Sequence, residues 1–136
     1  MTTIEAVKKI KEKFREHGNP TQIPLQRGRR FNARMTPKGI SVDNLGNQPL
    51  LTWEVFQEAV CVLQRNGGRS RRGNAMNFRL GEQGLPVDSI EGHIAFVVYG
   101  KQKGDFVFRR IAPIAAILVW ARICRASPGE LILLDL

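Results

Sequence analysis

The feature that most limits the fold is an apolar stretch near the C-terminus, residues 111–124. Ile114 to Trp120 run without a polar residue, and Pro113 and Arg122 leave the stretch shorter than the roughly 20 apolar residues that cross a bilayer. Because proline is tolerated in the first turn of a helix, we expect a helix over residues 112–124. A helix that is apolar nearly all round must be covered on both sides. The segment therefore predicts a central helix covered by its own chain or by a second copy.

Apolar periodicity predicts two further helices. Over residues 4–17 the apolar side chains recur at helical spacing, and Thr2 and Glu5 have the spacing of a capping box. The second helix is expected to begin after a cap at Thr52 and to end near Arg65, where an Asn-Gly-Gly sequence follows. Both helices have the polar and apolar faces of a helix packed on a core.

Short segments rich in β-formers lie between the helices. The expected strands are residues 31–35, 40–43, 76–80, 93–99, 106–110 and 130–134. From residue 40, and without the weaker candidate strand 76–80, the order reads β-α-β-β-α-β, which is typical of the split βαβ arrangement. The prediction is a single α+β domain over residues 1–136, with an antiparallel or mixed sheet and about three helices. A split β-α-β-β-α-β core with an added N-terminal helix fits this order.

Two segments hold the whole surplus of positive charge. Residues 27–38 and 65–79 each carry five Lys or Arg and no Asp or Glu, in a chain whose net charge is +9. Such a concentration favours an anionic partner, most simply nucleic acid. A membrane surface is usually met by a basic amphipathic helix, whereas these segments lie in expected loops. We therefore expect DNA or RNA as the partner and no membrane.

The arginines of these segments are the candidate contacts. Planar guanidinium groups bind phosphate oxygens bidentately, and the glycines of residues 66–74 allow a phosphate to approach the backbone closely. The predicted nucleic-acid-binding residues are Arg27, Arg29, Arg30, Arg34, Arg69, Arg71 and Arg72. We expect the last three to clamp a phosphate backbone, and the first four to extend the contact if folding brings both segments to one face.

Few residues have the pattern of a catalytic or metal site. Asp88, Glu91 and His93 are the only close trio of potential metal ligands, and a metal-dependent nuclease would need carboxylates that converge on one ion. A turn that leads into the expected strand explains these residues more simply. The sequence therefore indicates no catalytic residues, no metal site and no cofactor, and the nuclease stays an alternative.

Residues 103–108 resemble a fragment of the RNA-recognition-motif signature, in which strand aromatics stack on bases. Asp105 and Phe106 depart from that signature at two central positions. We therefore expect Phe106 and Phe108 to pack in the core instead.

The remaining expectations concern the cellular setting. Cys61 and Cys124 lie in apolar helical patterns and are expected to be reduced core cysteines. The first residues lack the apolar region of a secretion signal, which favours a cytoplasmic protein. The predicted function is non-catalytic nucleic-acid binding through arginine-rich loops. The alternative from another class is a self-associating interaction or regulatory module, which a homodimer would serve.

Overall fold

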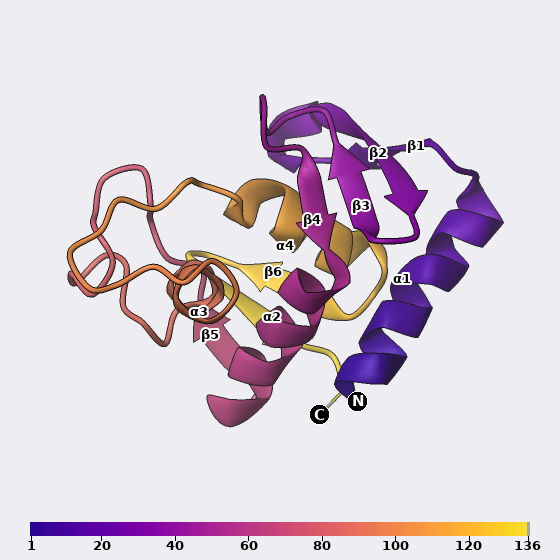
Figure 1. Cartoon of the computed structure of the whole chain (residues 1–136). Helices are drawn as coiled ribbons and strands as arrows, with labels where there is room; N and C mark the ends of the chain where they lie inside the picture. Colours follow the sequence, from indigo (N-terminus) through magenta and orange to yellow (C-terminus); the bar gives the residue numbers. More distant parts are fainter. Residues whose placement is uncertain (136) are drawn as a thin grey trace.

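The computed structural model describes residues 1–135, which form an α+β fold with four α-helices and two antiparallel sheets (Figure 1). The helices are α1 (Thr3–His17), α2 (Trp53–Arg65), α3 (Ile90–Val97) and α4 (Ile111–Trp120). The first sheet has the order β1 (Thr21–Pro24), β2 (Arg30–Thr36), β3 (Gly39–Val42) and β4 (Leu50–Thr52). The second has the order β5 (Arg69–Arg71), β7 (Glu130–Leu133) and β6 (Cys124–Ser127). A short 3₁₀ turn, η1 (Gln26–Gly28), joins β1 to β2. The predicted α+β class is confirmed.

The helices expected from amphipathic periodicity are present. The hydroxyl of Thr2 accepts the N–H of Glu5 at 3.0 Å and begins α1 as predicted. Thr52 precedes α2, but its side chain does not cap the helix, and its Oγ1 is buried without a hydrogen-bond partner in residues 1–135. At the other end of α2, Gly68 is left-handed and donates its N–H to the carbonyl of Leu63 at 2.8 Å.

Several expected strands are absent from residues 1–135. Residues 93–99 lie mostly in α3, which is capped by Ser89 through the N–H of Gly92 at 3.1 Å. Because most of α3 is buried, its sequence carries no polar stripe to distinguish it from a strand. Residues 76–80 and 106–110 form turns and irregular backbone. Two strands form where none is expected: β1 lies in an expected loop, and β6 begins at the expected end of a helix. The observed strands make two sheets in place of one split core.

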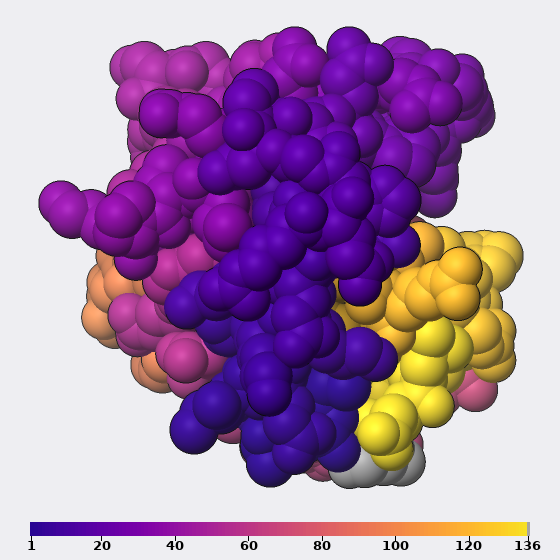
Figure 2. Space-filling model, turned by 90° about the vertical axis from the view of Figure 1, so that its right-hand side faces the viewer, coloured from indigo at the N-terminus to yellow at the C-terminus, as the bar shows by residue number. Residues whose placement is uncertain are grey.

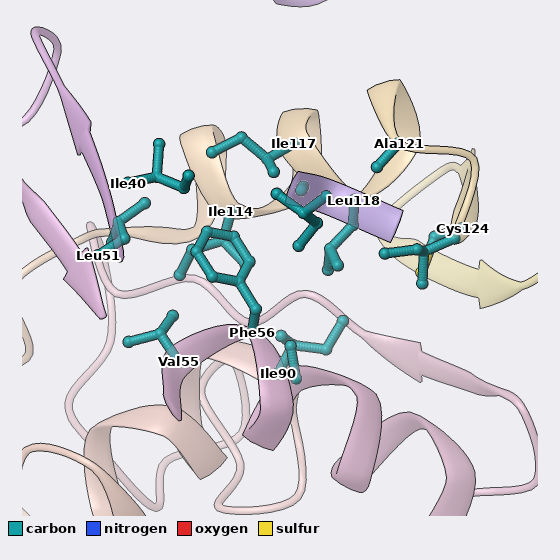
Figure 3. Close-up of a cluster of buried hydrophobic side chains, with 14 of the residues drawn as sticks. Ile40, Leu51, Val55, Phe56, Ile90, Ile114, Ile117, Leu118, Ala121 and Cys124 are labelled. Carbon is teal, nitrogen blue, oxygen red and sulfur yellow. The ribbon is translucent and has the colours of Figure 1, made fainter. Parts of the chain in front are cut away.

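Helix α4 lies at the centre of the core (Figure 3). Its residue Ile114 is fully buried, with Phe56 of α2 on one side and Ile40 and Leu51 of the first sheet on another. Figure 1 shows the same helix between the first sheet and the strands of the second. The chain itself therefore covers much of the apolar surface of α4, and a second copy is not needed to bury it.

Two side chains, Phe106 and Cys61, lie differently from the sequence expectation. Phe106 is 72% exposed and lies against the guanidinium of Arg79, with Cζ 4.3 Å from the ring centroid, so it is not a core residue. Cys61 is exposed on α2, whereas Cys124 is buried and burial raises the pKa of its thiol to about 12. Both cysteines are free. No helix within residues 1–135 is long and apolar enough to cross a membrane.

Candidate anion-binding cleft

A cleft of about 640 Å³ lies between the β1–β2 connection and α4. Figure 2 shows the surface hollowed between the violet first sheet and the orange and yellow C-terminal segments, which supply lining residues on two sides. The lining contains three arginines and no acidic residue: Pro24, Leu25, Gln26, Arg29, Arg72, Gly73, Asn74, Met76, Asn77, Arg109, Ile111, Ala112, Ala115, Ala116, Val119, Trp120 and Ala126. A volume between about 300 and 1,000 Å³ is typical of sites for small ligands.

The three arginines come from three separate parts of the chain. Arg29 follows η1, and its carbonyl accepts the N–H of Leu25 at 2.7 Å, which closes the β1–β2 connection. Arg72 follows β5; it donates its N–H to Gly129 at 3.0 Å, and its carbonyl accepts the N–H of Glu91 at 2.9 Å. Arg109 stands two residues before α4. Backbone hydrogen bonds therefore fix two of the three arginines that line the cleft.

The charges of these arginines are not neutralised by the chain's own carboxylates. Within residues 1–135 the only contacts with the geometry of an ion pair are Arg69–Glu130 and His93–Glu58, and neither contains an arginine of the cleft. Arg72 is half-buried, and this burial lowers the pKa of its guanidinium. An arginine titrates so far above neutral pH that it nevertheless stays charged. The cleft is therefore a cationic site with charge available for an anionic ligand.

The predicted clamp of Arg69, Arg71 and Arg72 is divided between two sites. Arg69 and Arg71 are the ends of β5, whereas Arg72 follows the strand, lines the cleft and donates its Nε–H to the carbonyl of Glu130 at 3.4 Å. Arg69 pairs with Glu130 at 2.5 Å, which raises the pKa of the guanidinium and lowers that of the carboxyl. Arg69 and Arg71 line a separate polar hollow of about 240 Å³ together with Asp88 and Glu130. Of these three arginines, only Arg72 therefore lines a site that has no acidic residue to offset its charge.

The other four predicted arginines begin at the cleft and continue along the first sheet. Arg29 lines the cleft, and Arg27 is exposed on η1 in a left-handed conformation with φ 61°. Arg30 and Arg34 lie on the exposed face of β2, and Arg30 is paired across the sheet with Pro24, which lines the cleft. The structure thus brings Arg29 and Arg72 together and places Arg30 at the edge of the same cleft.

The sequence does not indicate Arg109 as a binding residue, because the pattern of residues 106–110 is typical of a strand. Its neighbour Arg110 is buried, stacks on Tyr99 with Cζ 3.6 Å from the ring centroid, and donates to Gln48 at 2.6 Å. The available signal is a pair of arginines directly before an apolar helix. That signal does not tell which arginine is structural and which is free to bind.

Glu91 is a buried structural residue. Its Oε1 accepts the N–H groups of Arg110 at 2.7 Å and of Ile111 at 3.2 Å, so it occupies the N-terminus of α4. Loss of solvent raises the pKa of this carboxyl to about 7, although the two amides and the charges of Arg110 and Arg109 act in the opposite direction. Glu91 therefore positions the helix that forms the floor of the cleft.

Asp88, Glu91 and His93, the close trio of potential metal ligands in the sequence, do not converge. While Glu91 binds the start of α4, the Nε2 of His93 lies 2.9 Å from Oε1 of Glu58, and its Nδ1 lies 3.2 Å from Arg65. The backbone carbonyl of Asp88 accepts hydrogen bonds from the side chains of Asn66, at the end of α2, and of Ser70 in β5. Within residues 1–135, no three side chains of His, Cys, Asp or Glu are grouped so that they could hold a metal ion. Glu91 and His93 are buried residues of the fold, whereas Asp88 is exposed.

No protein-family model, curated protein or solved structure matches this chain. Function must therefore be inferred from the chemistry of the cleft.

Proposed function

We propose that the protein binds nucleic acid, DNA or RNA, by its phosphates and that the cleft is the site of contact. The supporting observation is the convergence of Arg29, Arg72 and Arg109 on a cleft whose lining has no acidic residue. Guanidinium groups bind phosphate oxygens through paired, charge-assisted hydrogen bonds. The net charge of +9 adds long-range attraction for a polyanion. The proposal assigns no catalytic role to the cleft.

The exposed face of β2 offers a continuation for a longer strand. Arg30 and Arg34 lie on this face, four residues apart, at a spacing of about 13 Å for an extended backbone. A nucleic acid held in the cleft would pass Arg30 first, because Arg30 is opposite the cleft residue Pro24. These two arginines act as outer contacts, while the cleft arginines carry the larger part of the binding.

The test compares two charge-matched double variants by the fluorescence anisotropy of labelled oligonucleotides over a range of salt. Arg29→Ala with Arg72→Ala removes two charges from the cleft. Arg69→Ala with Arg71→Ala removes two from the same region of sequence but outside the cleft. Three neutralised phosphates predict a slope of log affinity against log salt of about −2 for a single strand. The cleft variant should flatten this slope by about 1.4, whereas the control variant should change it less.

Equal affinities and slopes for the two folded variants would contradict the proposed site. Retained folding is checked for each variant by circular dichroism and thermal unfolding.

Self-association stays a prediction from the sequence. Light scattering at several protein concentrations tests it, and a constant monomer mass would exclude the dimer.

A further inference from the structure

The floor of the cleft differs chemically from its rim. Ala112, Ala115, Ala116 and Val119 have the spacing of one helical face, and they form an apolar floor along α4. Three of the four are alanines, so their side chains rise little above the helix. A phosphate placed on this floor would lose water without gaining a hydrogen bond, which is unfavourable. The arginines account for a phosphate at the site, but they do not account for the floor.

The walls are suited to a flat ring with a polar edge. Met76 is exposed and supplies polarisable apolar surface, as does the part of Trp120 that lines the cleft beside its packing against Phe14 and His17. The carboxamides of Gln26 and Asn77 supply hydrogen-bond donors and acceptors. Asn74 supplies only its amide N–H groups, because its Oδ1 already accepts the N–H groups of Met76 and Asn77 at 3.1 and 3.2 Å. A nucleobase has two apolar faces and a polar edge, and it is linked through its sugar to phosphates. Bases bound from single strands stack on aromatic side chains in this way. Phosphate-binding arginines beside an apolar floor therefore match a whole nucleotide better than a phosphate alone.

We propose that the cleft receives one unstacked base of a single-stranded nucleic acid while Arg29, Arg72 and Arg109 hold the adjoining phosphates. This inference rests on the proposed function and specifies the form of nucleic acid that is bound. In a duplex the base faces are covered by their neighbours, and extruding one base costs a few kcal/mol. A duplex can therefore offer the cleft its phosphates but not its bases, and the protein discriminates in favour of single strands.

The ligand side of the test uses three probes of equal length and equal charge per strand. They are an oligothymidylate, the same backbone with abasic sites throughout, and a duplex that contains the thymidylate strand. A uridylate strand is the RNA counterpart of the first probe. One stacked base predicts about 5- to 150-fold tighter binding of the single strand than of the abasic strand, measured by anisotropy at one salt concentration.

The protein side of the test uses Ala116→Leu, which enlarges a partly exposed residue of the floor and leaves all three arginines in place. It should bring the affinity for oligothymidylate down to that for the abasic strand and leave the salt slope unchanged. Ala116→Ser is the matched control, because serine is nearly as small and should retain most of the preference. If Ala116→Leu fails to fold, the comparison of the probes on the unaltered chain decides alone.

The outcomes separate the two proposals. Equal affinity of the unaltered chain for all three probes, with a steep salt slope, would overturn the base-binding inference and leave phosphate binding in place. An abasic strand that binds as tightly as the thymidylate strand would overturn it in the same way. No salt-dependent binding to any probe would remove the proposed function itself, and tight binding of an acidic peptide instead would reassign the cleft to a protein partner.

Discussion

Replacement of Glu91 by glutamine should leave the stability of the chain nearly unchanged at acidic pH and raise it at alkaline pH. Glu91 is almost fully buried at the N-terminus of α4, where desolvation raises the pKa of its carboxyl from 4.5 to about 7. Because that pKa is raised by folding, the folded chain holds the proton more tightly than the unfolded chain does. The stabilising contribution of the protonated group is thus complete below about pH 4.5 and is lost as the pH rises through 7.

The magnitude follows from the two pKa values. Each pKa unit corresponds to about 1.4 kcal/mol, so the free energy of unfolding should fall by about 3 kcal/mol over this range on account of Glu91. Glutamine keeps an oxygen that can accept the N–H groups of Arg110 and Ile111, but it never ionises. Glu91→Gln should therefore nearly equal the natural chain near pH 4.5 and exceed its stability by up to about 3 kcal/mol above pH 8.

The assay is urea denaturation followed by tryptophan fluorescence at a series of pH values. Glu91→Ala is the control, because it also removes the acceptor and leaves two buried amides unpaired, at a cost of about 1–3 kcal/mol for each. It should be less stable than the glutamine variant at every pH. A glutamine variant that is less stable than the natural chain at high pH would refute the reasoning. It would mean that the amides of α4 and the charge of Arg110 outweigh desolvation and keep the carboxylate ionised.

Two other predictions concern reactivity and backbone strain. Cys61 is exposed and should react quickly with a thiol reagent in the folded chain. Cys124 should react only after unfolding, because it is buried and burial raises the pKa of its thiol to about 12. Two fast-reacting thiols in the folded chain would contradict this packing. Gly39→Ala should destabilise the chain by more than about 1 kcal/mol in thermal unfolding, because Gly39 has φ 152° and an added Cβ would lie 2.1 Å from the carbonyl oxygen of Leu51. Gly46→Ala is its control, since Gly46 also has positive φ (58°) but no heavy atom within 4 Å of the added Cβ, and an equal loss in both would show that only the backbone angle matters.

The helices that could be predicted from the sequence are those with a solvent-exposed polar face. Helices α1 and α2 each have an exposed polar face, so the period of their apolar residues is visible in the sequence. Helix α3 is buried for most of its length and lacks such a face, and its run of β-formers indicates a strand instead. The separation into two sheets depends on contacts such as β5 with β7, about 60 residues apart, which local pattern does not encode.

The candidate site was predictable as a composition but not as a geometry. The basic segments are evident, and they supply Arg29 and Arg72 to the cleft. Which arginine of residues 69–72 lines the cleft depends on where β5 ends, and this strand of three residues is too short to be recognised from its own sequence. Arg109 reaches the cleft because an irregular segment ends where α4 begins, and its role follows only from the tertiary structure.

The most direct test of the cleft as the binding site is an NMR titration that follows the side-chain Nε–H signals of the arginines. Oligothymidylate added to isotopically labelled protein should move the signals of Arg29, Arg72 and Arg109, while that of Arg69, held by Glu130, should stay in place. Perturbation of Arg69 and Arg71 with the cleft arginines unmoved would contradict the account.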